Sequence, residues 1–321
     1  MRGCLMPDET IRDIAVLAGG VGAARFLEGV VQAVAPERVT AIVNTGDDTE
    51  FYGLTVSPDV DIVLYTLSGL VEPSQGWGVR GDTYAALEMF ERIGRERWFL
   101  LGDRDLAVHI HRTELLRQGK TPSEVTDDLR RRLGLAVRVL PMSDQPVRTT
   151  IRTPDGWLPF QEYFVHRRAQ DEVLEIRYDG SETASPAPGL LETIHAAKAI
   201  LISPSNPLVS VGTILSLAGV RDALRTTSAR IVGVSPIVGG ATIKGPADKM
   251  MRGLGMEVSA VGVARAYADF LDVLVIDNQD ADLAATVEAE GVKAVVTDTI
   301  MRDLDVKRAL AQVTLEQAGL R

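Results

Sequence analysis

The fold is decided by the stretch Val16–Arg25, which reads Val-Leu-Ala-Gly-Gly-Val-Gly-Ala-Ala-Arg. The apolar run Ile14–Ala18 predicts a buried strand, and Ala23–Val34 predicts a helix that follows it almost at once. Such a turn sets backbone N–H groups and the positive end of a helix dipole against a phosphate, and its glycines permit φ > 0. The spacing G-G-x-G is neither a complete dinucleotide fingerprint nor a Walker A loop, so a tight turn without a ligand stays open as an alternative.

Outward from this turn, strands and helices alternate along much of the chain. Further strands are predicted at Val39–Val43, Ala199–Ile202, Ile231–Val234, Val273–Ile276 and Lys293–Val296. Each ends in small, hydroxyl, amide or acidic residues, and right-handed connections would bring all these ends to one edge of a parallel sheet. We predict an α/β fold with a Rossmann-like, mostly parallel sheet and helices on both faces.

A segment of different character interrupts this alternation. Stretches of β-forming residues lie at Val137–Leu140, Val147–Thr153 and Phe160–Arg167, and Pro154-Asp155-Gly156 predicts a hairpin turn between two of them. We therefore expect a small β-rich insertion, within which Pro141–Asp144 reaches toward the functional site. The predicted division is a first part of the nucleotide- and metal-binding core at 1–135, the inserted β-rich subdomain at 136–190, and a second part of the core at 191–321.

The composition indicates a globular enzyme that acts on small molecules. The 321 residues are 45% hydrophobic and 24% charged, and the net charge of −10 disfavours nucleic acid and anionic membranes as partners. No apolar run approaches the ~20 residues of a membrane span, and Met1–Arg12 lacks the apolar core of a signal peptide, so the expected compartment is the cytoplasm. The single cysteine, Cys4, excludes an intrachain disulfide and a thiolate-cluster zinc site.

Acidic residues gather after the predicted strands and in the loops beside them, at Asp47, Asp48, Asp61, Asp82, Asp103 and Asp105. Carboxylates opposite a glycine-lined turn suggest a hard divalent cation that bridges them to phosphate oxygens, and Mg²⁺ is the natural choice. A solvated acidic surface is the alternative for most of these residues, so we expect about two of the six to be ligands.

Two further groups have a simpler alternative explanation. Ser57-Pro58-Asp59 reads as a helix start, so helix capping is an equal alternative for Asp59. His109 and His111 stand two residues apart on a predicted helix and point to different faces. We therefore interpret them as ordinary surface or half-buried histidines and not as a metal-binding pair.

Taken together, the motifs resemble those of the 2-phospho-L-lactate transferases, which act in the assembly of the deazaflavin coenzyme F(420). The matching pieces, in the family's order, are Leu17-Ala-Gly-Gly-Val-Gly22, Val43-Asn-Thr-Gly-Asp-Asp48, Ser57-Pro-Asp-Val-Asp61, Leu101-Gly-Asp-Arg-Asp105, Leu140-Pro-Met-Ser-Asp144, Pro204-Ser-Asn-Pro207, Ser235-Pro-Ile237 and Lys244-Gly-Pro246. The chain departs from the pattern at Ser203, where related proteins often have Gly or Ala, and at Val60, where Leu is usual.

The resemblance implies an activity, a cofactor and an assembly. Enzymes of this family take a guanosine-diphosphate-linked donor that bears a phosphorylated lactate or enolpyruvate. They pass the phospho-acyl unit to the terminal ribityl hydroxyl of the deazaflavin FO and release GMP. They require Mg²⁺, and they are Rossmann-like proteins, usually homodimers, with an inserted subdomain. The expected partners are therefore FO, the donor and a second copy of the chain.

Particular residues are expected to carry this activity. Asp61 and Asp47 are predicted at the metal and the acceptor hydroxyl, with Asp61 orienting or deprotonating that hydroxyl. Arg104 is predicted to neutralise phosphate charge, unless it only pairs with a neighbouring acid. The predicted metal ligands are Asp47 and Asp61, with Asp48 and Asp59 as second choices. The predicted substrate-binding residues are Gly19, Gly20, Val21, Gly22, Asn44, Asp61, Asp82, Leu100, Asp103, Ser205 and Asn206.

Two other classes of protein share parts of this pattern. Regulators of the gluconeogenesis-factor type bind nucleotide sugars on a related fold, but they carry a glycine-serine run after the paired acids, where this chain has Thr49-Glu50-Phe51-Tyr52. An NAD-dependent oxidoreductase would need a complete G-x-G-x-x-G, and position 25 is Arg instead of the third Gly or an Ala. Both classes are disfavoured, and binding of FO would exclude the regulator.

Overall fold

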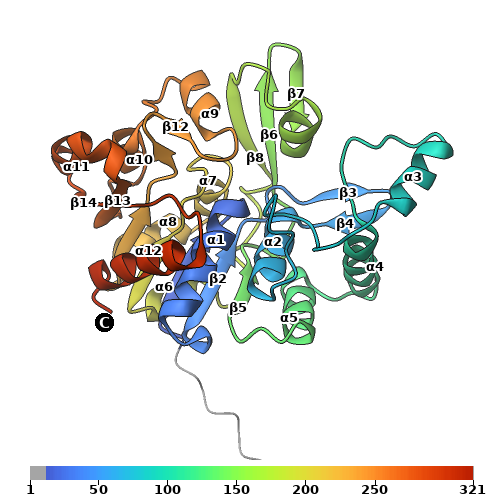
Figure 1. Cartoon of the computed structure of the whole chain (residues 1–321), viewed down its shortest axis with the longest axis horizontal. Coiled ribbons are helices and arrows are strands. Elements are labelled where there is room, and N and C mark those ends of the chain that lie inside the picture. The colour runs from blue at the N-terminus through green and yellow to red at the C-terminus, as the bar shows by residue number, and fades with distance from the viewer. Residues whose placement is uncertain (1–11, 321) are drawn as a thin grey trace, which may run out of the picture.

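The centre of the molecule is a seven-stranded parallel sheet, seen in a computed structural model that describes residues 12–320 (Figure 1). Cys4 and nearly all of Met1–Arg12 lie outside the described residues. In spatial order the strands are β14 (Lys293–Thr297), β13 (Val273–Asp277), β10 (Arg230–Val234), β9 (Ala199–Ile202), β1 (Ile14–Ala18), β2 (Val39–Val43) and β5 (Arg138–Pro141). The predicted α/β fold is confirmed, and the order of the strands reverses between β9 and β1.

Both faces of the sheet are covered, which explains why its strands read as unbroken apolar runs. Along β1, Ala15 and Leu17 join the apolar cluster on one face, while Ile14 and Val16 join the cluster on the other. The first face carries α6 (Leu190–Ala196), α7 (Val211–Leu215), α8 (Val220–Thr226), α10 (Ala260–Tyr267) and α11 (Ala284–Ala289). The second carries α1 (Gly20–Ala33), α2 (Pro58–Leu67), α5 (Pro122–Arg132) and α12 (Leu304–Gln317), with α1 between α2 and α12 (Figure 1).

The insertion is a three-stranded antiparallel sheet that projects from the core beside the carboxyl edge (Figure 1). Its strands are β6 (Arg148–Thr153), β7 (Gly156–Pro159) and β8 (Glu175–Asp179), and the predicted hairpin turn joins β6 to β7. The edge strand β5 pairs with β2 in the main sheet, although its residues fall within the segment predicted as the insertion.

The prediction that Phe160–Arg167 is a strand is wrong, because Glu162–His166 is helical. Phe160, Tyr163 and Phe164 follow the helical spacing, and Phe160 and Tyr163 are buried against β6 and Met250. The aromatic and β-branched composition favoured a strand, and tertiary packing of these rings overrode that preference.

A second projection extends to the right of the core in Figure 1. We call residues 49–56 and 68–117, which precede and follow α2, the aromatic lobe; it contains the hairpin of β3 (Thr49–Phe51) and β4 (Leu54–Val56), and then α3 (Ala85–Arg92) and α4 (Asp103–Arg117) (Figure 1). The remaining elements are short: β11 (Ile237–Val238), β12 (Ala241–Thr242), α9 (Ala247–Gly253) and the 3₁₀ turns Pro36–Arg38 and Asn278–Leu283. Within residues 12–320, no helix combines the length and the apolar content that crossing a bilayer would need.

Candidate active site at the carboxyl edge of the sheet

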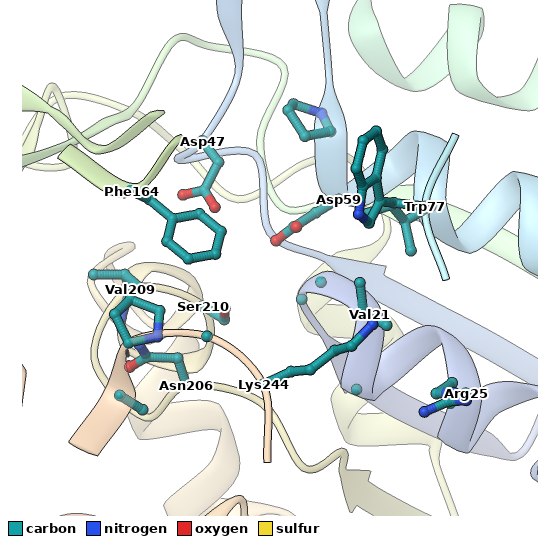
Figure 2. Close-up of a pocket in the computed structure, with 18 of the residues that line it drawn as sticks. Val21, Arg25, Asp47, Asp59, Trp77, Phe164, Asn206, Val209, Ser210 and Lys244 are labelled. Atoms are coloured by element: carbon teal, nitrogen blue, oxygen red, sulfur yellow. Dashed lines mark hydrogen bonds between the residues drawn. The ribbon is translucent and has the colours of Figure 1, made fainter. Parts of the chain in front are cut away.

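A cavity of about 850 Å³ lies along the carboxyl edge of the sheet (Figure 2). Its lining combines the β1–α1 turn, the start of α2, the aromatic lobe, the helical part of the insertion, and the loops after β9, β10 and β14. These segments lie far apart in the sequence and meet because the strands are parallel and all end on one side. Ligands of open α/β sheets bind at this edge, so the cavity is the candidate active site.

The glycine turn forms one wall of the cavity, and close packing explains its glycines. Gly20 has φ of +74°, in the left-handed region. A Cβ at Gly22 would lie 2.3 Å from the carbonyl oxygen of Pro204, and one at Gly19 would lie 2.5 Å from Cβ of Ser210. Helix α1 has no side-chain cap and no acidic residue in its first turn. Its first N–H groups therefore face the cavity, and no acidic side chain of α1 itself binds them.

Two buried carboxylates, Asp47 and Asp59, face this turn and point toward each other (Figure 2). Nδ2 of Asn44 donates to Oδ2 of Asp59 at 2.9 Å, whereas Oδ1 of Asp47 has no hydrogen-bond partner. Burial and the charge of Asp59 raise the pKa of Asp47 well above its usual range. Burial also raises the pKa of Asp59 to about 6, against the donors Asn44 and Gly20, which lower it. No cation pairs with either carboxylate among the described residues, so this pair of charges is uncompensated.

The pair fits a magnesium ion shared with a phosphate. Residues 12–320 contain no group of three His, Cys, Asp or Glu side chains that could enclose a metal. Mg²⁺ is commonly held by one or two carboxylates, with substrate phosphates and water completing its ligands. The unpartnered oxygen of Asp47, the repulsion between the two acids and the phosphate-binding geometry of the turn are the features that such an ion would use.

Asp61 also lines the cavity, but its surroundings differ from those of Asp59. Both of its oxygens accept hydrogen bonds from the guanidinium of Arg112, which is 4% exposed. Nδ1 of His109 lies 3.7 Å from Oδ2 of Asp61, and Nε2 of His109 lies 3.2 Å from Oδ1 of Asp105. Tyr65 donates to the same Asp105 oxygen at 2.6 Å. Asp61 is therefore ion-paired with Arg112 within a buried network between α2 and α4.

His109 and Arg112 are the main residues that the sequence interpretation missed. His109 is 1% exposed and lines the cavity, contrary to its interpretation as an ordinary surface or half-buried histidine. The signal was present in the spacing, because Asp105, His109 and Arg112 stand at i, i+4 and i+7 on one face of α4. This spacing is not apparent when His109 is compared only with His111.

Several predicted site residues hold the loops around the cavity in place. Asn44 binds Asp59 and the carbonyl of Val209, and Ser205 donates to the carbonyl of Gly19 at 2.9 Å. Asn206 lines the cavity, and its Oδ1 accepts from the N–H of Leu208 at 2.9 Å. These bonds lock the β9–α7 loop against the glycine turn.

Other predicted residues lie off the cavity. Asp48 accepts from Ser57 at 2.9 Å, and burial raises its pKa to about 7. Within the Pro141–Asp144 segment, Ser143 donates to the carbonyl of Ser185 and Asp144 caps the N–H of Ser123. None of this segment contributes to the lining, contrary to the expectation that it reaches the site.

Asp82, Asp103 and Arg104 also lie off the lining, because they organise the aromatic lobe. Asp103, at the start of α4, accepts from the N–H groups of Ala85 and Ala86 at the start of α3. In return, Asp82 before α3 accepts from the N–H groups of Arg104 and Asp105 in α4. Nη1 of Arg104 donates to the carbonyl of Arg80 and pairs with neither neighbouring acid. The two carboxylates act as reciprocal helix caps.

This arrangement predicts that Asp103→Ala lowers the melting temperature by a few degrees, because the first turn of α3 loses its acceptor. Thermal unfolding followed by circular dichroism measures the change. The KM for the acceptor, determined on the same variant, separates capping from substrate contact. A variant with unchanged melting temperature and a strongly raised KM would show that Asp103 binds substrate.

Part of the cavity lining is apolar and aromatic. Trp77, Leu100 and Phe164 contribute to it, and Leu100 is 41% exposed. Phe164 lies beside Asp47 and Trp77 beside Asp59 (Figure 2). Trp98, which also lines the cavity, stacks on His166 of the insertion, with ring centroids 5.1 Å apart. The two projections therefore touch at the cavity, and its aromatic side chains suit contact with a flat ring system.

Two cations stand beside the glycine turn. Lys244 extends toward Val21 (Figure 2), and its Nζ donates to the carbonyl of Gln75 at 2.5 Å. Arg25 lines the cavity one turn along α1. Burial and the charge of Arg25 lower the pKa of Lys244. Among residues 12–320 neither cation pairs with a carboxylate, so both can meet a phosphate.

Comparison with known proteins agrees with this geometry. The sequence model of one family, described as 2-phospho-L-lactate transferase CofD, matches residues 14–315. The chain is 45% identical to a phosphoenolpyruvate transferase of Streptomyces griseus, over 95% of this chain and 98% of the relative. It is 40% identical to a 2-phospho-L-lactate transferase of Methanothermobacter thermautotrophicus, over 94% of this chain and 97% of the relative. A crystal structure of a UPF0052 family protein from Bacillus halodurans shares the fold, with a TM-score of 0.64 at 17% identity over 95% of this chain and 99% of that one. The chain belongs to the CofD family of 2-phospho-L-lactate transferases.

Proposed function

We propose that the protein transfers the phosphorylated three-carbon unit of a guanosine-diphosphate-linked donor to the terminal ribityl hydroxyl of FO, with release of GMP, in coenzyme F(420) assembly. The observation that carries the proposal is the pair Asp47 and Asp59, which has no ionic partner within residues 12–320 and faces a glycine turn in a cavity that also has aromatic side chains in its lining. Family membership supports the reaction class. The pair and the turn support a phosphate-bound Mg²⁺.

The donor diphosphate is assigned to the glycine turn. The N–H groups at the start of α1 and the cations Lys244 and Arg25 would bind its oxygens. Mg²⁺ held by Asp47 and Asp59 would supply neutralisation of the charge that develops on the phosphoryl oxygens. The guanosine would then extend along the loops after β9, β10 and β14, because Asn206, Ser235 and Thr299 of these loops offer polar groups in the cavity lining.

The acceptor is assigned to the aromatic part of the lining. The flat deazaflavin would pack between Trp77, Leu100 and Phe164, and its ribityl chain would reach Asp61. The hydroxyl oxygen then attacks the phosphorus that carries the three-carbon unit. The bond from this phosphorus to the bridging oxygen breaks, GMP leaves with that oxygen, and the hydroxyl proton passes to solvent or a carboxylate.

We propose phosphoenolpyruvate as the three-carbon unit, on the strength of the relatives alone. The Streptomyces griseus phosphoenolpyruvate transferase is 45% identical to this chain, against 40% for the Methanothermobacter 2-phospho-L-lactate transferase. The test is incubation of the protein with FO, Mg²⁺ and each donor separately, with mass analysis of the products. We expect GMP and the phosphoenolpyruvyl ester of FO, and a smaller yield from the phospholactyl donor.

The same incubation separates the alternatives. Absence of any FO product, together with binding of a nucleotide sugar, would overturn the transferase proposal in favour of a regulator. Omission of Mg²⁺ or its chelation should abolish turnover, and full activity without a divalent cation would overturn the metal assignment. A homodimer is proposed from the family resemblance, and light scattering of the purified protein tests it.

Lys244→Met is expected to raise the KM for the donor about tenfold or more, because a charge-assisted bond to phosphate is lost. The KM for FO should rise less, since Lys244 extends toward the glycine turn and touches the loop of Trp77 only through its bond to the carbonyl of Gln75. Steady-state kinetics with each substrate varied in turn measures both values. A larger effect on FO than on the donor would contradict the assignment of the diphosphate to this wall.

A further inference from the structure

The acidic residues that line the cavity fall into two electrostatic classes. Asp59 and Asp61 stand two residues apart near the start of α2 and therefore project from different sides of the helix. Asp59 meets the neutral amide of Asn44 and faces Asp47, with no cation beside it. Asp61 meets the guanidinium of Arg112 with both oxygens. Asp59 and Asp61 are thus suited to different ligands.

Hydrogen bonds fix the position of the Arg112 side chain. It reaches from α4 to α2, its Nη1 donates to Oδ2 of Asp61 at 3.0 Å, and its Nη2 donates to Oδ1. Nη1 also lies 3.2 Å from Nδ1 of His109, and the His109 ring packs between Asp61 and Asp105, 3.7 Å and 3.2 Å from their oxygens. The side chains of Arg112 and Asp61 are 4% and 6% exposed, so the ion pair is largely shielded from solvent.

We infer that Arg112 is a positioning residue that commits Asp61 to holding the acceptor's hydroxyl and removes Asp61 from the set of metal ligands. A divalent cation on Asp61 would lie next to a buried guanidinium, and the repulsion between them is only weakly screened. A neutral hydroxyl meets no such repulsion, and it can donate to the lone pair that each carboxylate oxygen keeps after its bond to Arg112. Arg112 itself touches neither substrate, because it does not line the cavity.

This inference rests on the proposed function, and it departs from the expectation that Asp61 is a ligand of Mg²⁺. It assigns the metal to Asp47 and Asp59 and the acceptor hydroxyl to Asp61. The two roles can be measured separately. The affinity for FO tests the role of Asp61, and the Mg²⁺ concentration needed for activity tests the roles of Asp47 and Asp59.

The test is a double-mutant cycle on Asp61→Asn and Arg112→Gln, with FO binding followed by deazaflavin fluorescence. Each single variant should weaken FO binding about tenfold or more, and the double variant should bind FO no more weakly than Asp61→Asn alone. Arg112→Lys keeps the charge but loses the bidentate hydrogen bonds to Asp61, and it should raise the KM for FO more than it lowers kcat. The Mg²⁺ concentration for half-maximal activity, and the thermal shift produced by Mg²⁺ with GDP, should change less than about twofold in all of them.

Arg131→Gln is the matched control, because Arg131 lies on the surface of α5 and pairs only with Asp127. If Arg112→Gln does not fold, the double variant avoids leaving an unpaired buried charge, and Arg112→Lys tests the same geometry. Additive losses of FO binding would show that Arg112 contacts FO itself and would overturn the inference. A Mg²⁺ requirement that rises with Asp61→Asn would overturn it equally. Failure of the wild type to convert FO would instead count against the proposed function.

Discussion

Replacing Asp59 by Asn is expected to stabilise the protein and, at the same time, to reduce its turnover about a hundredfold or more. The gain arises because burial penalises the charge of Asp59, raising its pKa to about 6, and because this charge in turn helps to raise the pKa of Asp47. The amide removes that charge and can still accept a hydrogen bond from Asn44, which lies 2.9 Å from Oδ2. The loss arises because an amide oxygen is a weaker ligand for Mg²⁺ than a carboxylate.

The sign of the pH dependence follows from the raised pKa. In the unfolded chain an aspartate ionises near pH 4, while the folded pKa is about 6. As the pH rises from about 4 to about 6, the unfolded state releases this proton first, so the wild type loses stability. The loss, on the order of 2 kcal/mol, is complete above that window, and Asp59→Asn does not suffer it. At neutral pH the variant should therefore melt a few degrees higher.

Calorimetry between pH 4 and pH 8 and steady-state kinetics at neutral pH measure the two effects. Asp222→Asn is the control, because its side chain is 76% exposed and pairs with Arg225 on the surface. It should alter neither the turnover nor the shape of the stability profile. A variant of Asp59 that melts lower than the wild type, or that keeps full turnover, would contradict the account of an uncompensated metal-binding pair.

Gly22→Ala is expected to inactivate the enzyme and to lower its stability by about 3 kcal/mol or more. The new Cβ would lie 2.3 Å from the carbonyl oxygen of Pro204, and neither atom belongs to a flexible side chain. Either α1 or the β9–α7 loop must move, and both form the wall assigned to the donor diphosphate. The melting temperature should fall by about 5 °C or more, and the KM for the donor should rise in the protein that remains folded.

Gly94→Ala separates this clash from the ordinary effect of adding a side chain. Gly94 has φ of +85°, but no atom lies within 4 Å of the place that its Cβ would take, and it does not belong to the cavity lining. Its replacement should cost about 1 kcal/mol through backbone conformation alone and leave the kinetics unchanged. Equal losses in the two variants would show that contact with Pro204 is not what requires glycine at position 22.

The sequence predicted the central sheet well, because each strand carries its own local signal. Ile14–Ala18 and Val39–Val43 are apolar throughout, apart from Thr40, and are buried on both faces, which is the pattern of interior parallel strands. The glycine turn was visible for a similar reason, since its glycines are concentrated in one short loop and the start of one helix. The helix at Glu162–His166 was missed because its aromatic residues favour strands until they are packed against β6.

The site was less predictable, because its interactions join residues that are distant in the chain. Acidic residues all look alike in a sequence, yet Asp61 is compensated by an arginine 51 residues away while Asp59 has only Asn44. Asp82 and Asp103 also look like candidate ligands in the sequence, but in the structure they cap helices of the aromatic lobe. Only the fold determines which carboxylates remain without a partner, and those are the ones available to a ligand.

The exchange of caps between Asp82 and Asp103 has a consequence for the aromatic lobe. Asp103 accepts from the first N–H groups of α3, and Asp82 accepts from those of α4. Loss of either carboxylate would therefore weaken the joint between the two helices and not only one helix start. Because Leu100 lies in the loop between α3 and α4 and lines the cavity, this joint also holds one part of the cavity wall in place.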